Sequence, residues 1–472
     1  MAQNLRRPTV IWLGDKPPKR LARLMRERDL LLSVGDIGSV KETSPRAVLL
    51  PFVGDNPGIF SRVVVPVINT GAMLIVVTDD YSDFATRIID NFVGDDPERP
   101  VRILKTTEDV RIAQECAAFD VGREPNDKLV ITGAYPETPE RDMLFRRAFG
   151  DFERIAITSL DGDDAGGGKS GASLRRVDAI GFGGIAAQPF VTKIGLGKNI
   201  ADEIDATKDF VMEYVPFQHR PPLVLNRCVI GPKFRMMTSM FIAGATRLDD
   251  FLLKHQPDGL IRRLLTGPLR GWRETPNTEL LALGPAYEKY RLLPPAERLR
   301  VAATKHSPAP DELFARLHAI PPQEVRVCPS HGDLHLWNVF VTSNREIILI
   351  DFAATDRQST HIARDLATLD VSLMFYVEPA KEEAFSEADL RVQYEDPLRC
   401  RRISAVAGSL SHRLSMLRDV RSEAEQCCLT GTEYRIAVAC ALLRYAAKEK
   451  NEQLLHQRSI AYDLAASLIW HE

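Results

Sequence analysis

Residues 330–341 read SHGDLHLWNVFV, and IILIDF follows at residues 347–352. In this stretch Asp333 precedes Asn338 by five residues, and Asp351 follows Asn338 by thirteen. The segments after Asn338 and before Asp351 are apolar and β-branched, which predicts two strands joined as a hairpin. Such a hairpin returns Asp351 to the neighbourhood of Asn338.

These polar residues suit phosphoryl transfer. A site for that chemistry holds a nucleoside triphosphate with Mg²⁺ and orients a hydroxyl in line with the γ-phosphate. Mg²⁺ takes oxygen ligands, which the amide of Asn338 and the carboxylate of Asp351 can supply. Asp333 can point into the same cleft and accept the proton of the hydroxyl, while the two strands give rigid support.

The pattern HGDxxxxN, IDF and then DLA at residues 365–367 resembles the aminoglycoside phosphotransferase and choline kinase-like family, which shares the protein-kinase fold. The resemblance implies an α+β two-lobed protein-kinase-like domain. It gives Asp333 the role of catalytic base, and Asn338 and Asp351 the role of Mg²⁺ ligands. It also implies that His331 and Asp365 brace the catalytic loop.

Two positions depart from protein kinases. Gly332 stands where those kinases carry Arg, and Ala353 stands where they carry the Gly of the DFG motif. Both differences favour a kinase of small molecules over a regulated protein kinase.

The resemblance also implies a smaller lobe before the catalytic loop, which we place at residues 151–244. Strands are expected at 154–160 and 174–180, on either side of DGDDAGGGKSGASL. Within it, Gly168, Ser170 and Gly171 are expected over the nucleotide phosphates, because glycines let backbone N–H groups approach closely. A Walker A loop is an alternative, although the spacing to the preceding glycine is one residue too long. A plain flexible hairpin is another.

Residues 189–195 (PFVTKIG) predict a short apolar strand that contains Lys193, and a buried ammonium there needs a partner. The resemblance implies that Lys193 binds the α- and β-phosphates and that Glu203 orients it. Asp202 and Asp205 are alternative acidic partners. The alternative is that Lys193 is a surface lysine on an edge strand, without a functional role.

Residues 236–243 (MMTSMFIA) predict a strand that leads to the hinge between the lobes, where the backbone near Phe241 and Ala243 would meet the adenine edge. The helical lobe then covers residues 245–472. Apolar spacing predicts its helices at 279–291, 295–303, 311–318, 363–376, 399–420, 432–449 and 453–469.

Residues 1–120 alternate between short apolar segments and helical patterns, which predicts an α/β domain with a doubly wound parallel sheet. Residues 121–150 are rich in Pro, Gly and charge and suit an inter-domain connection with one short helix at 139–149. The expected strands are 9–13, 47–52, 73–78 and 101–104, and the expected helices are 18–30, 82–92 and 108–119.

The order of these elements resembles a response-regulator receiver domain. Asp15, Thr78 and Lys105 stand at the positions of its acidic, hydroxyl and lysine residues. The phosphoacceptor position falls on Pro51, with Asp55 as the nearby substitute, so the resemblance implies a degenerate receiver with a regulatory or docking role and a protein partner. An unrelated three-layer α/β domain is the alternative.

Composition excludes several classes. The charge sum is 61 − 64 = −3, so nucleic acid and anionic membranes are not expected partners. Seven cysteines without a CxxC pair indicate reduced thiols. Without an apolar stretch long enough for a membrane span, we expect a cytoplasmic protein.

Together these features predict an ATP- and Mg²⁺-dependent phosphotransferase that acts on the hydroxyl of a small molecule, with GTP as the alternative nucleotide. Residues 378–396 carry seven acidic and two basic residues, which would suit a cationic acceptor or form a solvated helix. Different hypotheses are a nucleotide-binding pseudokinase scaffold in a bacterial signalling or defence system, and transfer of phosphate or nucleotide to protein hydroxyls.

Overall fold

In the computed structural model the chain forms two compact units, Met1–Ile204 with Pro222–Phe241, and Asp205–Pro221 with Ile242–Glu472. The structure describes residues 9–43, 45–52, 60–64, 66–67, 72–79, 101–118, 125–134, 138–160, 172–231, 234–274, 276–290, 293–355, 360–377, 384–399, 408–448 and 454–470. Within these ranges, no helix combines the length and apolarity needed to cross a bilayer.

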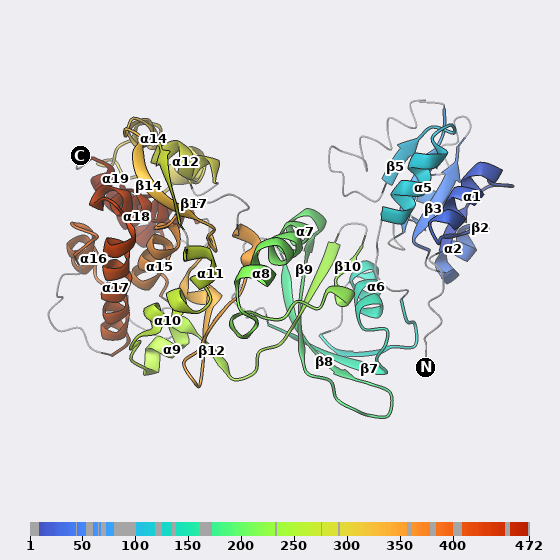
Figure 1. The fold of residues 1–472 in the computed structure, drawn as a ribbon, viewed down its shortest axis with the longest axis horizontal. Coiled ribbons are helices and arrows are strands. Elements are labelled where there is room, and N and C mark those ends of the chain that lie inside the picture. The colour runs from blue at the N-terminus through green and yellow to red at the C-terminus, as the bar shows by residue number, and fades with distance from the viewer. Residues whose placement is uncertain are drawn as a thin grey trace. The chain divides into compact units, whose positions relative to one another are not determined.

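The first unit begins with a five-stranded parallel sheet of order β2-β1-β3-β4-β5 (Figure 1). This order is that of flavodoxin-like doubly wound sheets. The parallel sheet predicted for residues 1–120 is therefore confirmed. Its strands are β1 Thr9–Trp12, β2 Leu31–Val34, β3 Ala47–Pro51, β4 Met73–Val77 and β5 Val101–Leu104.

Helices cover both faces of this sheet. Leu21 and Ile112 pack with Val10 on one face, and Val40 packs with Ile11 on the other. Successive strand residues point to opposite faces, so this split follows from the period of two in a strand. The helices are α1 Lys19–Glu27, α2 Ile37–Thr43 and α5 Asp109–Ala118.

The sequence did not predict β2 and α2. β2 has four residues and lies at the edge of the sheet, where Leu31 and Val34 are half exposed, so no buried run marks it. The helix expected at 82–92 and the substitute phosphoacceptor Asp55 lie outside the described residues.

A six-stranded sheet of order β10-β11-β9-β8-β7-β6 completes the first unit. Its pairs are antiparallel except for β6 with β7, which are parallel. The strands predicted at 154–160, 174–180, 189–195 and 236–243 are confirmed with shifted ends. They are β7 Arg154–Ser159, β8 Ser173–Ile180, β9 Phe190–Leu196 and β11 Phe234–Met240, with β6 Val130–Gly133, β10 Val229–Ile230 and helix α7 Gly197–Ala206.

Residues 121–150, expected as a connection, supply β6 and the helix α6 Pro139–Ala148 to this sheet and its core. The side chain of Thr138 caps α6 by accepting a hydrogen bond from the backbone of Arg141 at 3.4 Å. The rings of Phe149 and Phe190 pack edge to face with centroids 5.4 Å apart. The short helix expected at 139–149 is confirmed. The described part of this segment, however, belongs to the sheet and its core and is not a separate connection.

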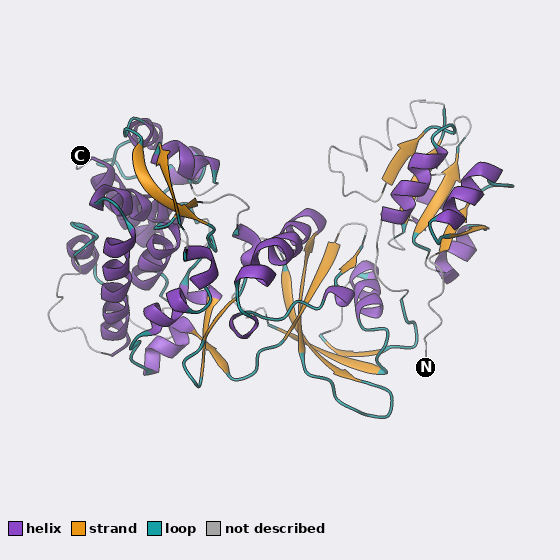
Figure 2. Cartoon of the chain, in the orientation of Figure 1, coloured by secondary structure: helices purple, strands orange, loops and turns teal. Residues whose placement is uncertain are grey.

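The second unit is mostly helical, as Figure 2 shows, and carries two three-stranded sheets. Residues 279–281, expected to begin a helix, instead end a strand, because Leu281 pairs with Gln323. The sheets have the orders β12-β15-β16 and β13-β14-β17, with bounds Ala245–Arg247, Val339–Thr342 and Ile347–Leu349, and Asn277–Leu281, Gln323–Cys328 and Thr360–His361.

One large core holds these helices together. The helix expected at 399–420 is described from Gly408 to Cys427, and those at 363–376, 432–449 and 453–469 are confirmed with shifted ends. The helices are α8 Met212–Tyr214, α9 Leu248–Lys254, α10 Leu260–Thr266, α11 Arg270–Arg273, α12 Leu283–Lys289, α13 Ala296–Leu299, α14 Pro310–His318, α15 Arg364–Phe375, α16 Glu387–Tyr394, α17 Gly408–Cys427, α18 Gly431–Ala446 and α19 Leu455–Trp470.

Candidate active site

The hairpin of β15 and β16 brings Asn338 and Asp351 to the same end of one ladder. Val339 pairs with Leu349, and the backbone N–H of Ile350 donates to the carbonyl of Asn338 at 3.1 Å. Asn338 and Asp351 therefore flank the last rung, as the thirteen-residue spacing predicted. Asp351 has φ of 62°, a left-handed conformation that turns the chain directly after the strand.

A buried carboxylate holds the turn before the candidate base. The oxygens of Asp365 on α15 accept hydrogen bonds from the backbone N–H groups of His331 at 2.8 Å and Gly332 at 2.9 Å. The Nε2 of His331 lies 2.9 Å from the carbonyl oxygen of Ile350. His331 and Asp365 thus connect the loop to the hairpin and to α15.

Gly332 is a position where the backbone demands glycine. Its φ is +79°, and a Cβ there would lie 2.1 Å from the carbonyl oxygen of Ala354. The arginine that protein kinases carry at this position would not fit this backbone.

The carboxylate of Asp333 is partly accessible, with 18% of its side chain exposed. Its Oδ1 lies 3.1 Å from Nη2 of Arg444, and its Oδ2 lies 3.5 Å from Nε2 of His335. The amide of Asn338 donates to the backbone carbonyl of Asp333 at 2.9 Å. Asp333 and Asn338 are therefore brought together with a cation on one side of the carboxylate.

Arg444 on α18 is the site residue that sequence reasoning missed. It also donates to the carbonyl of Gly332 at 2.9 Å. Nothing in its local sequence distinguishes it from other arginines of an amphipathic helix. Only the packing of α18 beside the loop places it there.

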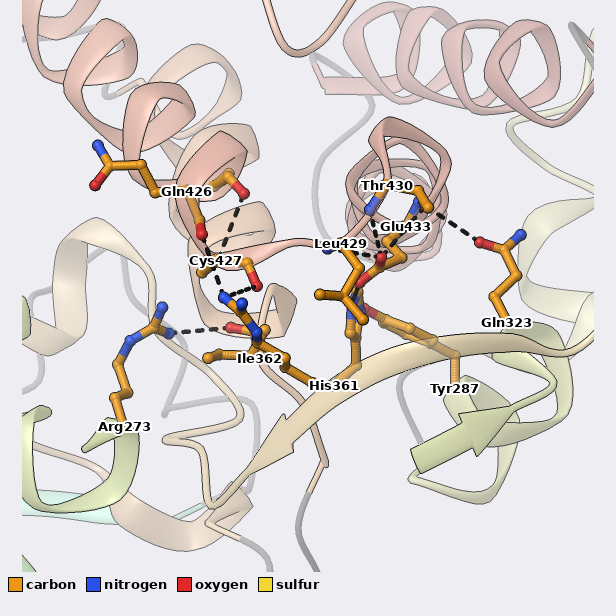
Figure 3. A network of polar contacts seen from close by, with 12 residues as sticks. Arg273, Tyr287, Gln323, His361, Ile362, Gln426, Cys427, Leu429, Thr430 and Glu433 are labelled. Carbon is orange, nitrogen blue, oxygen red and sulfur yellow. Dashed lines mark hydrogen bonds and ion pairs between the residues drawn. The ribbon is translucent and has the colours of Figure 1, made fainter. Parts of the chain in front are cut away.

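A buried polar network fixes the start of α18 (Figure 3). Glu433 closes a capping box by accepting from the backbone N–H of Thr430 at 2.6 Å. Its other oxygen lies 3.2 Å from Nε2 of His361 on β17, and the hydroxyl of Tyr287 lies 2.9 Å from Nδ1 of His361. Burial raises the pKa of Tyr287 well above its usual range, so the phenol stays protonated.

Lys193 and Glu203 meet as predicted. The ammonium of Lys193 on β9 lies 2.7 Å from Oε2 of Glu203 on α7, and the two side chains are 15% and 5% exposed. Asp205, one of the alternative partners, lies 3.8 Å from Lys208 instead. The pair is buried, which disfavours the alternative of a surface lysine.

The other expected nucleotide contacts differ in outcome. Gly168, Ser170 and Gly171 lie outside the described residues. Phe241 donates its backbone N–H to the carbonyl of Pro189 at 2.8 Å, so that donor is already engaged. Ala243 is exposed.

The segment that contains the candidate catalytic loop is similar to known proteins. Residues 255–401 match the model of a phosphotransferase enzyme family. This segment of the chain is thus similar to phosphotransferases. The matched segment contains Asp333, Asn338, Asp351 and Asp365. No curated protein matches the sequence.

Solved structures with similar chains have low identity. An aminoglycoside phosphotransferase of Streptomyces rimosus is 16% identical, with 56% of this chain and 94% of that chain covered and a TM-score of 0.28. Choline kinase of Streptococcus pneumoniae is 13% identical, with 66% and 92% covered and a TM-score of 0.30. A macrolide 2′-phosphotransferase of Brachybacterium faecium is 14% identical, with 67% and 92% covered and a TM-score of 0.32.

Proposed function

We propose that this protein is an ATP- and Mg²⁺-dependent phosphotransferase that moves the γ-phosphate to a hydroxyl group of a small molecule. The arrangement of Asp333, Asn338 and Asp351 around the Asp365-braced loop carries the proposal. The family match over residues 255–401 supports the same chemistry.

In the proposed reaction the hydroxyl oxygen of the acceptor forms a bond to the γ-phosphorus while the bond between that phosphorus and the bridging oxygen of ADP breaks. Asp333 accepts the hydroxyl proton. The bracing by Asp365 and His331 lowers the cost of orienting the base, because the loop is already held before the acceptor binds.

The donor set fits a magnesium ion. The amide nitrogen of Asn338 is bonded to the carbonyl of Asp333 at 2.9 Å, which leaves Oδ1 as the ligand atom. The carboxylate of Asp351 supplies a second hard oxygen. Magnesium bound by these residues would neutralise charge on the nucleotide phosphates.

The nucleotide would be held by residues of the first unit. We assign Lys193 to the phosphates, with Glu203 orienting its ammonium at 2.7 Å. Gly168, Ser170 and Gly171 would cover the phosphates, and the chain from Phe241 to Ala243 would meet the base. ATP is the proposed nucleotide, with GTP as the alternative.

For the N-terminal domain we propose a regulatory or docking role as a degenerate receiver with a protein partner. The strand order β2-β1-β3-β4-β5 supports this. Pro51 ends β3, and proline has no nucleophilic oxygen, so phosphorylation at that position is excluded.

The test incubates the purified protein with Mg²⁺, ATP and a cell metabolite extract and follows the products by mass spectrometry. Asp333→Asn and Asp351→Ala variants run beside it. A phosphorylated small molecule that both variants fail to make would establish the function. Undiminished transfer by Asp351→Ala would contradict it, and ATP binding without transfer would indicate the nucleotide sensor instead.

A further inference from the structure

We propose that His361, Cys428 and Glu433 form a zinc site that clamps the strand β17 to the start of the helix α18. The three residues belong to the second unit. The inference does not depend on the proposed function, because it concerns how this helical unit is held together and involves none of the residues assigned to the nucleotide or to magnesium.

Three side chains from distant segments bring different ligand atoms together here. An imidazole nitrogen of His361, the thiol sulfur of Cys428 and a carboxylate oxygen of Glu433 all lie within 4.8 Å of one another. Among the residues that the structure describes, no other three His, Cys, Asp or Glu side chains form a group of this kind. Imidazole nitrogen, thiolate sulfur and carboxylate oxygen are the ligand types that zinc takes in proteins.

The spacing of two ligand atoms already suits the ion. Nε2 of His361 and Oε2 of Glu433 are 3.2 Å apart. Bonds of about 2.0–2.3 Å to a tetrahedral zinc ion place its ligand atoms about 3.3–3.8 Å from one another. The sulfur of Cys428 therefore completes the set with a movement of at most about 1 Å. Cys428 is half-buried and lies in the turn between α17 and α18, where a side chain can rotate more easily than within a helix.

The outer polar atoms of the two buried ligands are held by the protein (Figure 3). Nδ1 of His361 lies 2.9 Å from the hydroxyl of Tyr287. Oε1 of Glu433 accepts hydrogen bonds from the backbone N–H groups of Leu429 at 2.9 Å and Thr430 at 2.6 Å. Outer partners of this kind fix the orientation of metal-binding imidazoles and carboxylates. They direct Nε2 and Oε2 toward one point, where a metal ion can replace the proton that the pair otherwise shares.

The charges of the ligands balance the charge of the ion. His361 and Glu433 are 2% and 0% exposed, and an uncompensated charge at that depth is costly. The Cys428 thiol gives its proton to water when it binds zinc, so the thiolate and the carboxylate cancel the two positive charges while the imidazole stays neutral. A thiolate and an imidazole also select zinc over magnesium, which prefers oxygen ligands. Water is the fourth ligand, because the neighbouring thiol of Cys427 lies outside this group.

The zinc site connects elements that support the candidate catalytic loop. β17 ends at His361, and α15 begins at Arg364 with Asp365 holding the loop. α18 begins beside the zinc site and carries Arg444 near its other end. An ion that binds the folded chain alone stabilises it by mass action, so zinc should raise the stability of the second unit.

The first experiment strips the full-length protein of metal with a chelator and then adds Zn²⁺ or Co²⁺ in the presence of excess Mg²⁺. The excess Mg²⁺ competes for sites that are made of oxygen ligands alone. We expect about one zinc ion per chain to remain after gel filtration, and bound Co²⁺ to show the charge-transfer absorption of a thiolate ligand. Retention of no zinc, or cobalt binding without that absorption, would overturn the proposal.

Variants then locate the ion. Tyr287→Phe removes an outer partner of His361 and should weaken zinc binding about tenfold to a hundredfold. Cys428→Ala removes a ligand, so it should weaken binding by at least about a hundredfold and abolish the charge-transfer absorption. Cys440→Ala removes a buried thiol from α18 and is the matched control, with zinc affinity expected at the parent value. Equal zinc affinity of Cys428→Ala and the parent would place the ion elsewhere and contradict the proposal.

Urea denaturation separates loss of the ion from damage to the fold. In the presence of a chelator, the parent and Cys428→Ala should unfold at similar midpoints. Added zinc should raise the midpoint of the second unit in the parent and in Cys440→Ala, and it should leave that of Cys428→Ala unchanged. A parent midpoint that zinc does not move would refute the clamp.

Discussion

Replacing Asp365 by Asn should loosen the catalytic loop without changing the size of the side chain. Both carboxylate oxygens accept a backbone hydrogen bond in the structure, from His331 at 2.8 Å and Gly332 at 2.9 Å. The amide keeps one acceptor and turns the other into a donor. That donor would face a backbone N–H, so one of the two bonds is lost.

The magnitude follows from these contacts. A hydrogen bond to a charged acceptor contributes about 1.5–3 kcal/mol, and a buried donor left unsatisfied costs about 1–3 kcal/mol. Asp365 is 3% exposed, so water does little to compensate. We expect the variant to lose about 3 kcal/mol in the free energy of unfolding of the second unit, roughly a hundredfold in its equilibrium constant.

Urea denaturation followed by tryptophan fluorescence measures this change. Three of the four tryptophans, Trp272, Trp337 and Trp470, belong to the second unit. Asp311→Asn on α14 is the matched control, because 74% of that side chain is exposed. If both variants unfolded at the parent midpoint, the bracing role of Asp365 would be refuted. Under the proposed function, kcat should fall as well while KM for ATP stays near the parent value.

Three further outcomes are expected. Gly332→Ala should destabilise the second unit by at least about 2 kcal/mol, since a left-handed residue and a Cβ 2.1 Å from a carbonyl oxygen are both unfavourable; a parent-like urea midpoint would count against it. Glu203→Gln should raise KM for ATP about tenfold by removing the negative charge that lies 2.7 Å from the Lys193 ammonium, and unaltered steady-state kinetics would argue otherwise. Burial raises the pKa of the Cys116 thiol from 9.0 to about 12. The stabilisation from keeping this thiol neutral is complete below pH 9 and is lost as pH rises toward 12, so Cys116→Ala should flatten the pH dependence of the first unit's stability in that range.

The loop could be predicted because its chemistry is local. Asp333, Asn338 and Asp351 are fixed by one turn and one hairpin, and the spacing between them determines their register. Burial of the Lys193 ammonium predicted an acidic partner, and only the family resemblance pointed to Glu203 rather than to Asp202 or Asp205.

The missed features depend on contacts between distant segments. β6 and β13 are largely exposed strands without a clear alternating pattern. Each forms a strand because it pairs with a segment distant in the sequence, β6 with β7 and β13 with β14. Arg444 reaches Asp333 across more than a hundred residues of sequence. Its position follows from how α18 packs, which local periodicity does not encode.

The parallel edge strand β6 sets where this protein could be divided or recombined. Asn126 donates its side-chain amide to the carbonyl of Gly150 at 2.8 Å, and Arg146 reaches the carbonyls of Asn126, Asp127 and Leu129 at 3.1–3.2 Å. A gene fusion that exchanged the N-terminal domain at residue 150 would remove the edge strand β6 and the helix α6 from the six-stranded sheet. The phenylalanines that α6 packs against would then be exposed. A viable chimera must therefore be joined before Asn126. The segment that was expected as an inter-domain connection would then be transferred together with the phosphotransferase part of the chain.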